Sequence, residues 1–201
     1  MSKNTYLLKS KETVTVRGLS RDDVLLSHEF FQSIPESKRK YFRSDVMNIN
    51  HLEERCLEAE KGKVIRRIAL MSEAIVADAS LAIDSDSWKS GTAHLRLVID
   101  PNHIGKGVQF ALAKDMYDIA YEKHLEKIVS EFMRPQKDLM EIYQKLGFRI
   151  EGVLPDYVHD QEGKEQDMVI MIASLADLRK AQQFIGDWLD NGHGSVGAGE
   201  M

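Results

Sequence analysis

Hydrophobic and polar residues change their spacing several times along the chain, and each spacing predicts a different element. β-Branched and polar residues alternate over residues 13–17, which is typical of a short strand. Two apolar runs, residues 64–71 and 74–83, are separated by only two residues and predict a hairpin. Residues 92–99 predict a further strand with an apolar face and an opposite face that includes His94 and Arg96.

Elsewhere, apolar residues recur every three or four positions, which predicts amphipathic helices. The predicted helices cover about residues 20–34, 36–60, 107–123, 139–146 and 178–189, the second of them broken near residues 44–50. Further strands are predicted at about residues 127–133, 148–153 and 166–173. We expect Ser20 and Asn50 to cap helix N-termini and Gly147 to end a helix in the left-handed conformation.

This order of elements predicts an α+β fold with a mixed, mostly antiparallel central β-sheet flanked by helices. The chain has 201 residues, enough for a sizeable core, and we expect a single domain over residues 1–190. Residues 191–201 are rich in glycine, so we expect a disordered tail. The final helix has an apolar face, including Ile185 and Trp188, that packs either on the sheet or against a second subunit. A monomer and a homodimer therefore both stay open.

Charge and composition disfavour several classes of protein. Asp and Glu number 32 against 27 Lys and Arg, a formal charge of −5, so we expect no nucleic-acid partner. Basic clusters at residues 38–43 and 61–67 could face phosphates, but such clusters are more typical of solvated surfaces. The single Cys56 has no disulfide partner, and the dispersed histidines indicate no metal site. Because no apolar run resembles a signal peptide or a membrane span, we expect a cytoplasmic protein that does not bind a membrane.

The junction between residues 98 and 108 combines a strand, a short loop with two glycines and the start of a helix. Gly105 and Gly107 let the backbone approach a ligand closely, and the first helical turn offers free N–H groups and a positive dipole end. These features favour a phosphate or pyrophosphate ligand. The loop does not fit the Walker A pattern, which disfavours ordinary nucleotide hydrolysis. The structural alternative is a turn that only connects the two elements.

Two segments resemble motifs of the GNAT N-acetyltransferase superfamily. Asp100-Pro101 followed by Ile104-Gly105-Lys106-Gly107-Val108-Gln109 is similar to the family's acetyl-CoA signature. Ile142-Tyr143-Gln144-Lys145-Leu146-Gly147-Phe148 is similar to its Tyr-x-x-x-Gly-Phe segment. The resemblance covers about Val14 to Ala173 and implies the GNAT-like acyl-CoA N-acyltransferase fold, with acetyl-CoA as the acetyl donor.

The resemblance also implies roles for individual residues. The backbone of Leu97, Val98 and Ile99 would contact the pantetheine arm, and Tyr143 would protonate the leaving thiolate. The residues expected to hold the pyrophosphate are Ile104, Gly105, Lys106, Gly107, Val108 and Gln109. Gln136 would place a side-chain amide before the tyrosine-containing helix. Ile104, Gln109 and Gln136 replace residue types that are usual in the family: Arg or Gln, Gly or Ala, and Asn respectively.

Transfer to an amine also requires a way to remove a proton, because a lysine-like amine with a pKa of about 10.4 is almost wholly protonated at neutral pH. His94 is one candidate base, since its reference pKa of about 6.5 suits that work. By resemblance, it stands where members similar to bacterial protein lysine acetyltransferases often have Glu. Glu131 on the next strand is the second candidate. Each also has a structural interpretation, a histidine satisfied within the sheet and an ion-paired strand carboxylate.

The resemblance thus implies an N-acetyltransferase that moves acetyl directly from acetyl-CoA to an amine in a ternary complex. The acceptor stays open among a protein lysine, a protein N-terminus, a polyamine and an antibiotic amine, with His94 slightly favouring protein lysine. The alternative is a CoA-binding regulatory module that has kept the fold and transfers acetyl poorly. Fold alone does not separate these two functions.

Overall fold

The computed structural model describes residues 3–190, apart from the side chains of Phe184, Asp187, Trp188 and Asp190. The predicted tail and the Trp188 side chain therefore lie outside the described part. The strands are β1 (Lys3–Leu7), β2 (Thr13–Gly18), β3 (Ile65–Met71), β4 (Ala74–Ile83), β5 (Thr92–Ile99), β6 (Lys127–Met133), β7 (Arg149–His159) and β8 (Glu165–Ser174). The helices are α1 (Val24–Ser33), α2 (Glu36–Arg39), α3 (Ile49–Glu60), α4 (Val108–Glu122), α5 (Lys137–Lys145) and α6 (Leu175–Asp190). Short 3₁₀ turns are η1 (Arg21–Asp23), η2 (Ser87–Lys89) and η3 (Pro101–His103).

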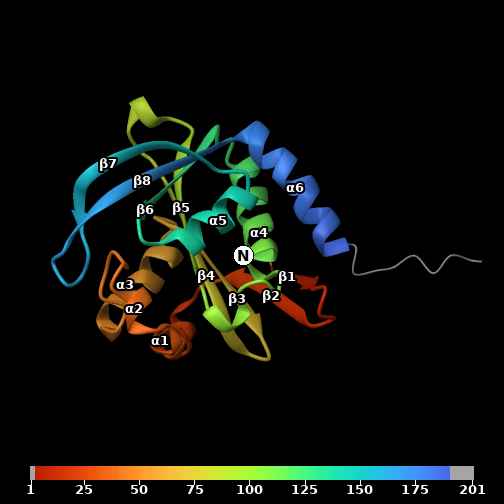
Figure 1. Ribbon diagram of the computed structural model, residues 1–201. Helices are drawn as coiled ribbons and strands as arrows, with labels where there is room; N and C mark the ends of the chain where they lie inside the picture. Colours follow the sequence, from red (N-terminus) through yellow and green to blue (C-terminus); the bar gives the residue numbers. More distant parts are fainter. Residues whose placement is uncertain (1–2, 191–201) are drawn as a thin grey trace, which may run out of the picture.

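The strands form one eight-stranded sheet in the order β1-β2-β3-β4-β5-β6-β8-β7. Neighbouring strands are antiparallel except β5 and β6, which are parallel because α4 crosses from the end of one to the start of the other. In Figure 1, α4 and α6 cover one side of the sheet and α1, α2 and α3 lie on the other. The α+β class and the mixed, mostly antiparallel sheet are confirmed.

The parallel pair β5 and β6 separates after three residues. Thr92 to His94 pair with Lys127 to Val129, and the ladder then stops. The carbonyl oxygen of Leu95 accepts a hydrogen bond from Ser130 Oγ at 2.8 Å, so this buried acceptor is satisfied without a partner strand. The second half of β5 therefore leaves an opening in the middle of the sheet.

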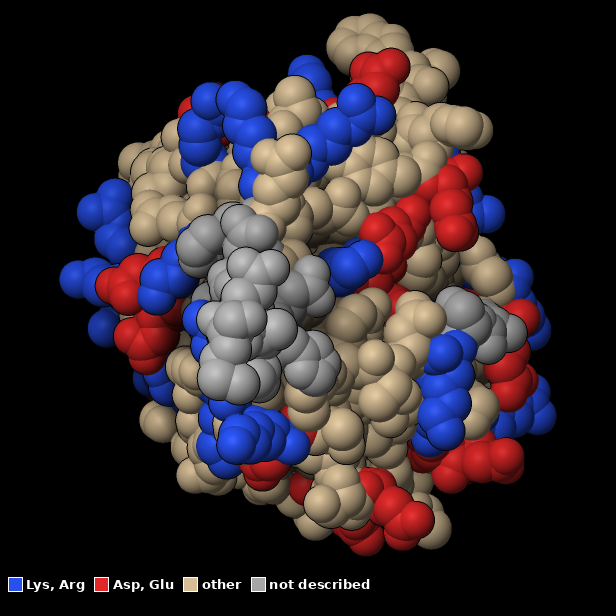
Figure 2. Space-filling view, turned by 90° about the vertical axis from the view of Figure 1, so that its right-hand side faces the viewer, with Lys and Arg blue, Asp and Glu red and all other residues tan. Residues whose placement is uncertain are grey.

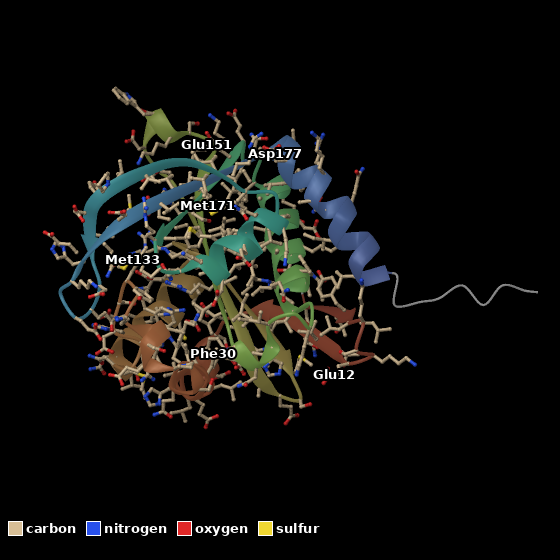
Figure 3. All side chains as sticks on the ribbon, viewed as in Figure 1. Glu12, Phe30, Met133, Glu151, Met171 and Asp177 are labelled. Atoms are coloured by element: carbon tan, nitrogen blue, oxygen red, sulfur yellow. The ribbon has the colours of Figure 1, made fainter. Side chains whose placement is uncertain are left out.

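Each side of the sheet has its own hydrophobic cluster. The larger lies under α4, α5 and α6 and includes the fully buried Leu112 and Tyr143. The smaller lies under α1 and α3 and includes Phe31 and Leu52. Figure 3 shows the buried Met171 inside the molecule and Glu12 at its periphery.

Several predicted boundaries need correction. Asn48, not Asn50, caps α3, because the Asn48 side chain accepts a hydrogen bond from the backbone N–H of Asn50 at 3.0 Å. The predicted helix at 36–60 is reduced to α2 and α3, and the helix expected from Ser20 begins with the turn η1. β1 was not predicted; it is an edge strand paired only with β2.

The apolar face of α6 packs within the chain. Leu178, Ile185 and Leu189 are buried in the larger cluster. The structure thus shows this face packed on the sheet and on α4, the first of the two arrangements that the sequence left open.

Within residues 3–190, no helix combines the length and the apolar character needed to cross a membrane. The same residues bring together no group of three or more His, Cys, Asp or Glu side chains that could hold a metal ion.

Candidate active site

Two adjoining cavities occupy the opening between β5 and β6, with volumes of about 100 Å³ and about 150 Å³. Both are lined by Leu97 and Val98 of β5 and by Gln136, which precedes α5. The smaller cavity extends to Ile99 and Ile104, toward the glycine loop. The larger one extends to Glu131 and Tyr143, under α1 and α3. The structure thus brings together predicted site residues from β5, β6, α5 and the loop before α4.

The glycine loop begins with a capped turn. Asp100 accepts hydrogen bonds from the backbone and side chain of Asn102 at 2.9 and 3.0 Å, and its other oxygen lies 2.9 Å from His103 Nδ1. Gly105 and Gly107 then have φ of 84° and 98°, a conformation that favours glycine. The local sequence therefore fixes the path of the chain into α4.

The loop presents four backbone donors. The amides of Gly105, Gly107, Val108 and Gln109 have no hydrogen-bond acceptor among residues 3–190. They precede or begin α4, so the helix dipole adds a partial positive charge at the same place. Lys106 is exposed beside them. This arrangement can bind a phosphate or pyrophosphate through backbone groups alone.

The three residues that depart from the resembled motifs have different surroundings. The Gln109 side chain is only 5% exposed, and its Oε1 has no hydrogen-bond partner among the described residues. Ile104 is 46% exposed and forms part of the wall of the smaller cavity. Gln136 Oε1 accepts a hydrogen bond from the backbone N–H of Met133 at 2.8 Å, which shapes the turn before α5.

Tyr143 is completely buried in the wall of the larger cavity. Its ring packs edge-on against Phe132 and Phe148, with centroids 4.8 and 4.9 Å away. Its hydroxyl donates to the Leu95 carbonyl at 3.4 Å, a long bond to an acceptor already taken by Ser130. Burial raises the pKa of Tyr143 well above its ordinary value, although hydrogen bonds from Ser130 and the Leu97 backbone act against it. The phenol is therefore protonated at neutral pH and its proton is weakly engaged.

The two candidate bases have unequal positions. Glu131 lines the larger cavity but is ion-paired with Arg43. Burial acts to raise the pKa of Glu131, but the hydrogen bond and charge of Arg43 outweigh it, so the pKa lies below its usual range. His94 lines neither cavity, and its Nε2 lies 3.9 Å from Asp84 Oδ2. Burial lowers the pKa of His94, so its imidazole is neutral at pH 7.

The larger cavity also contains charged residues that the sequence analysis did not single out. Asp78 of β4 receives a hydrogen bond from Arg55 of α3 at 2.8 Å and is only 5% exposed. Arg66 and Arg96 line the same wall. One sequence signal was available, since Asp78 interrupts an otherwise almost wholly apolar strand.

Comparison with known families agrees with this geometry. The family model described as "Acetyltransferase (GNAT) family" matches residues 26–148, more than half of the chain. The chain belongs to the GNAT acetyltransferase family. No curated protein sequence matches significantly.

Solved structures show the same fold at low sequence identity. RimJ from Mycobacterium smegmatis, in complex with CoA-disulfide, has a TM-score of 0.75 and 14% identity, covering 92% of each chain. Ribosomal-protein-S5-alanine acetyltransferase from Vibrio fischeri has a TM-score of 0.70 and 15% identity, covering 82% of this chain and 94% of that one. Spermidine N-acetyltransferase from Vibrio cholerae, in complex with CoA and spermine, has a TM-score of 0.68 and 20% identity, covering 83% and 98%.

Surface charge is mixed where it can be seen. Figure 2 shows the side of the molecule near α6, where Lys and Arg side chains are interspersed with Asp and Glu. Three of the basic residues from cluster 38–43 form ion pairs: Lys38 with Asp138 at 2.8 Å, Lys40 with Glu162 at 3.0 Å, and Arg43 with Glu131. These pairs support the solvated-surface interpretation of that cluster over the phosphate-binding one.

Proposed function

We propose that this chain transfers acetyl from acetyl-CoA directly to an amine in a ternary complex. The observation that supports the proposal best is the opening between β5 and β6, which joins the unpaired amides before α4 to the buried Tyr143. Membership of the GNAT family and the CoA bound to similar structures support the donor.

The donor would supply an activated acetyl thioester, and the residues around the smaller cavity would hold it. The backbone of Leu97, Val98 and Ile99 borders the cavity for the pantetheine arm. Gly105, Gly107 and the first turn of α4 would bind the pyrophosphate through their free N–H groups. Because these donors belong to the backbone, the proposal does not depend on the side chain at Ile104. The buried Gln109 side chain does not extend into solvent over the loop.

Tyr143 is the proposed general acid. Attack of the amine nitrogen on the thioester carbonyl forms a C–N bond and breaks the C–S bond, leaving a thiolate that needs a proton. Tyr143 lines the larger cavity and is protonated at neutral pH, and its hydroxyl makes a long, 3.4 Å bond to the Leu95 carbonyl beside the hydrogen bonds from Ser130 and the Leu97 backbone. It can therefore give its proton to the sulfur, and positioning of both substrates supplies much of the remaining acceleration.

The attacking amine must lose one proton. Glu131 is the candidate base inside the larger cavity, where a water molecule could relay the proton, and its pairing with Arg43 keeps it ionised. His94 is neutral and lies on the same strand face as Arg96, but it does not line the cavity. We favour Glu131 over His94 because of this placement.

One observation favours the regulatory alternative. Of the two candidate bases, Glu131 is the one that lines the cavity. It is ion-paired with an arginine that lowers its pKa, which makes it a weak base. A CoA-binding module without efficient transfer would have the same loop and opening. Binding and transfer must therefore be measured separately.

Thermal unfolding with acetyl-CoA, with ATP as the control, tests binding. At 100 times the dissociation constant, binding adds about 2.7 kcal/mol, which corresponds to a midpoint shift of roughly 5–10 °C. Thiol release from acetyl-CoA, with and without a panel of primary amines, tests transfer. Amine-dependent release is expected; a thermal shift without release would support the regulatory module, and no shift at millimolar acetyl-CoA would overturn both.

Release should fall strongly in Glu131→Gln and little in His94→Gln if Glu131 is the base. The reverse order would assign the role to His94. Equal and small effects would indicate that the amine loses its proton to water.

A further inference from the structure

Three polar side chains form a row across the sheet beneath α1 and α3. Arg66 of β3 is paired in register with Ser80 of β4, and Ser80 is paired with Arg96 of β5. Residues in register across neighbouring strands point to the same face, so all three line the larger cavity. The two arginine Cα atoms are separated by two strand spacings, ~10 Å, which long side chains can close around one small ion.

The cavity has an excess of positive charge. Its wall contains Arg43, Arg55, Arg66 and Arg96 but only two carboxylates, Asp78 and Glu131. Asp78 is taken by Arg55 at 2.8 Å, and Glu131 is taken by Arg43. These pairs leave Arg66 and Arg96 without a direct hydrogen bond to a carboxylate of the cavity wall, although the charge of Asp78 acts on Arg66 and that of Glu131 acts on Arg96.

The two remaining arginines differ in exposure, because Arg66 is largely buried and Arg96 is exposed. Arg66 is 12% exposed, and its Nη2 reaches Glu58, outside the cavity, only at 3.4 Å. Its Nε is buried and has no partner in the described structure. Arg96 forms no hydrogen bond or ion pair with residues 3–190. Burial and the charge of Arg43 lower the pKa of Arg96 most, and the charge of Arg66 adds to this, while the charge of Glu131 acts against it.

The buried Arg66 Nε, which has no partner in the described structure, is costly unless a ligand supplies an acceptor, and the exposed Arg96 adds a second guanidinium on the same cavity wall. We propose that the Arg66–Ser80–Arg96 row binds a carboxylate or phosphate of the acceptor, and that the acceptor is a small amine with such an anion within a few bonds of its nitrogen. This inference rests on the proposed transfer function and specifies its acceptor. Guanidinium groups suit both anions because they donate two parallel N–H bonds to paired oxygens.

The distance between anion and amine is limited by the position of Tyr143. Arg96 lies between Leu95, which accepts the Tyr143 hydrogen bond, and Leu97, whose backbone faces the same hydroxyl. An anion held by Arg96 thus places a nearby amine beside the proposed general acid. The same positive field repels a second ammonium group, so a polyamine is a poor acceptor.

Matched acceptors separate these possibilities. 4-Aminobutanoate, 4-aminobutanamide and 1,4-diaminobutane have the same chain length and differ in the charge at the far end. Phosphoethanolamine and ethanolamine form a second pair that tests phosphate. We expect kcat/KM for an anionic member to exceed that of its neutral partner at least tenfold, with the diamine poorest; the better anion identifies carboxylate or phosphate. Equal rates, or a preference for the diamine, would overturn the proposal while leaving acetyl transfer intact.

A binding measurement does not require acetyl-CoA. Thermal unfolding is followed with 4-aminobutanoate, phosphoethanolamine and inorganic phosphate at constant ionic strength. We expect at least one anion to raise the midpoint of the wild type and of Arg21→Gln, a control at an exposed arginine paired with Glu60 outside the cavity. Arg66→Gln and Arg96→Gln should lose the shift; Arg96 is exposed, so its substitution is compatible with folding. No shift in the wild type, or an equal shift in Arg96→Gln, would refute the anion site even if acetyl-CoA binds.

Discussion

Removing the carboxylate of Asp115 should destabilise the protein strongly. Asp115 of α4 accepts hydrogen bonds from Arg67 Nε at 2.5 Å and Nη2 at 3.0 Å, and from Asn4 Nδ2 at 2.6 Å. Both charged side chains are 2% exposed. Asp115→Ala would leave the Arg67 guanidinium buried between the sheet and α4 with no counter-charge.

The expected cost follows from that burial. Breaking a buried ion pair from one side costs about 3–5 kcal/mol, much of it the penalty of the stranded charge. In a domain of about 200 residues each kcal/mol lowers the midpoint by about 2–4 °C, so Asp115→Ala should unfold roughly 6–20 °C below the wild type. The double variant Arg67→Met/Asp115→Leu should recover most of the loss, because it removes both charges and keeps apolar volume.

Urea and thermal unfolding measure the effect. The control is Lys114→Ala, which removes the neighbouring exposed ion pair to Asp118, 3.0 Å long, and should change stability by less than about 1 kcal/mol. An Asp115→Ala variant within 1 kcal/mol of the wild type would refute the reasoning. So would a double variant that is no more stable than Asp115→Ala.

Three further predictions concern the site, a turn and a titration. Tyr143→Phe should lower kcat for thiol release by about 100-fold or more, with little change in acetyl-CoA affinity. The control is Tyr117→Phe, which removes a buried hydroxyl bonded to Leu146 at 2.6 Å and should leave kcat unchanged. Equal kcat in both variants would remove the acid role. Gly147→Ala should lower the free energy of urea unfolding by about 2–4 kcal/mol, because φ is 94° and a Cβ would lie 3.1 Å from the Asp177 carbonyl oxygen. Gly163→Ala, where φ is 78° and the space is open, should lower it by only about 1–2 kcal/mol. Equal losses of stability would contradict the steric argument. His94 has a folded-state pKa below its ordinary value, so the unfolded chain takes up its proton first as the pH falls. The stability of the wild type relative to His94→Asn should therefore decrease from about pH 7 to pH 5. A difference in stability that stays constant over this range would refute the lowered pKa of His94.

Much of the scaffold follows from local patterns. The hairpin β3–β4, the strand face shared by His94 and Arg96, and the left-handed Gly147 are confirmed, because alternation and glycine placement are local properties. β1 was missed since its five residues include only two apolar side chains and gain order by pairing with β2. Asn48 and Asn50 are both acceptable caps in sequence, and only the hydrogen bond chooses between them.

The site was less accessible to sequence reasoning. The loop and Tyr143 follow from motif resemblance, and they remain predictions as functional residues. The pairing of Arg43 with Glu131 joins residues 88 positions apart, so periodicity gives no sign of it. The Arg66–Ser80–Arg96 row depends on the register of three strands. The excess of positive charge in this cavity is apparent only from the structure, in which Asp78 and Glu131 are each paired with another arginine.

The most direct test of the central claim is to follow the acetyl group itself. The wild-type protein is incubated with acetyl-CoA labelled in the acetyl methyl group and with each matched amine, and the products are identified by mass spectrometry. We expect label on the amine nitrogen, formed in proportion to enzyme and strongly reduced in Tyr143→Phe. Binding of acetyl-CoA without label on any amine, or label transfer that is unchanged in Tyr143→Phe, would contradict it.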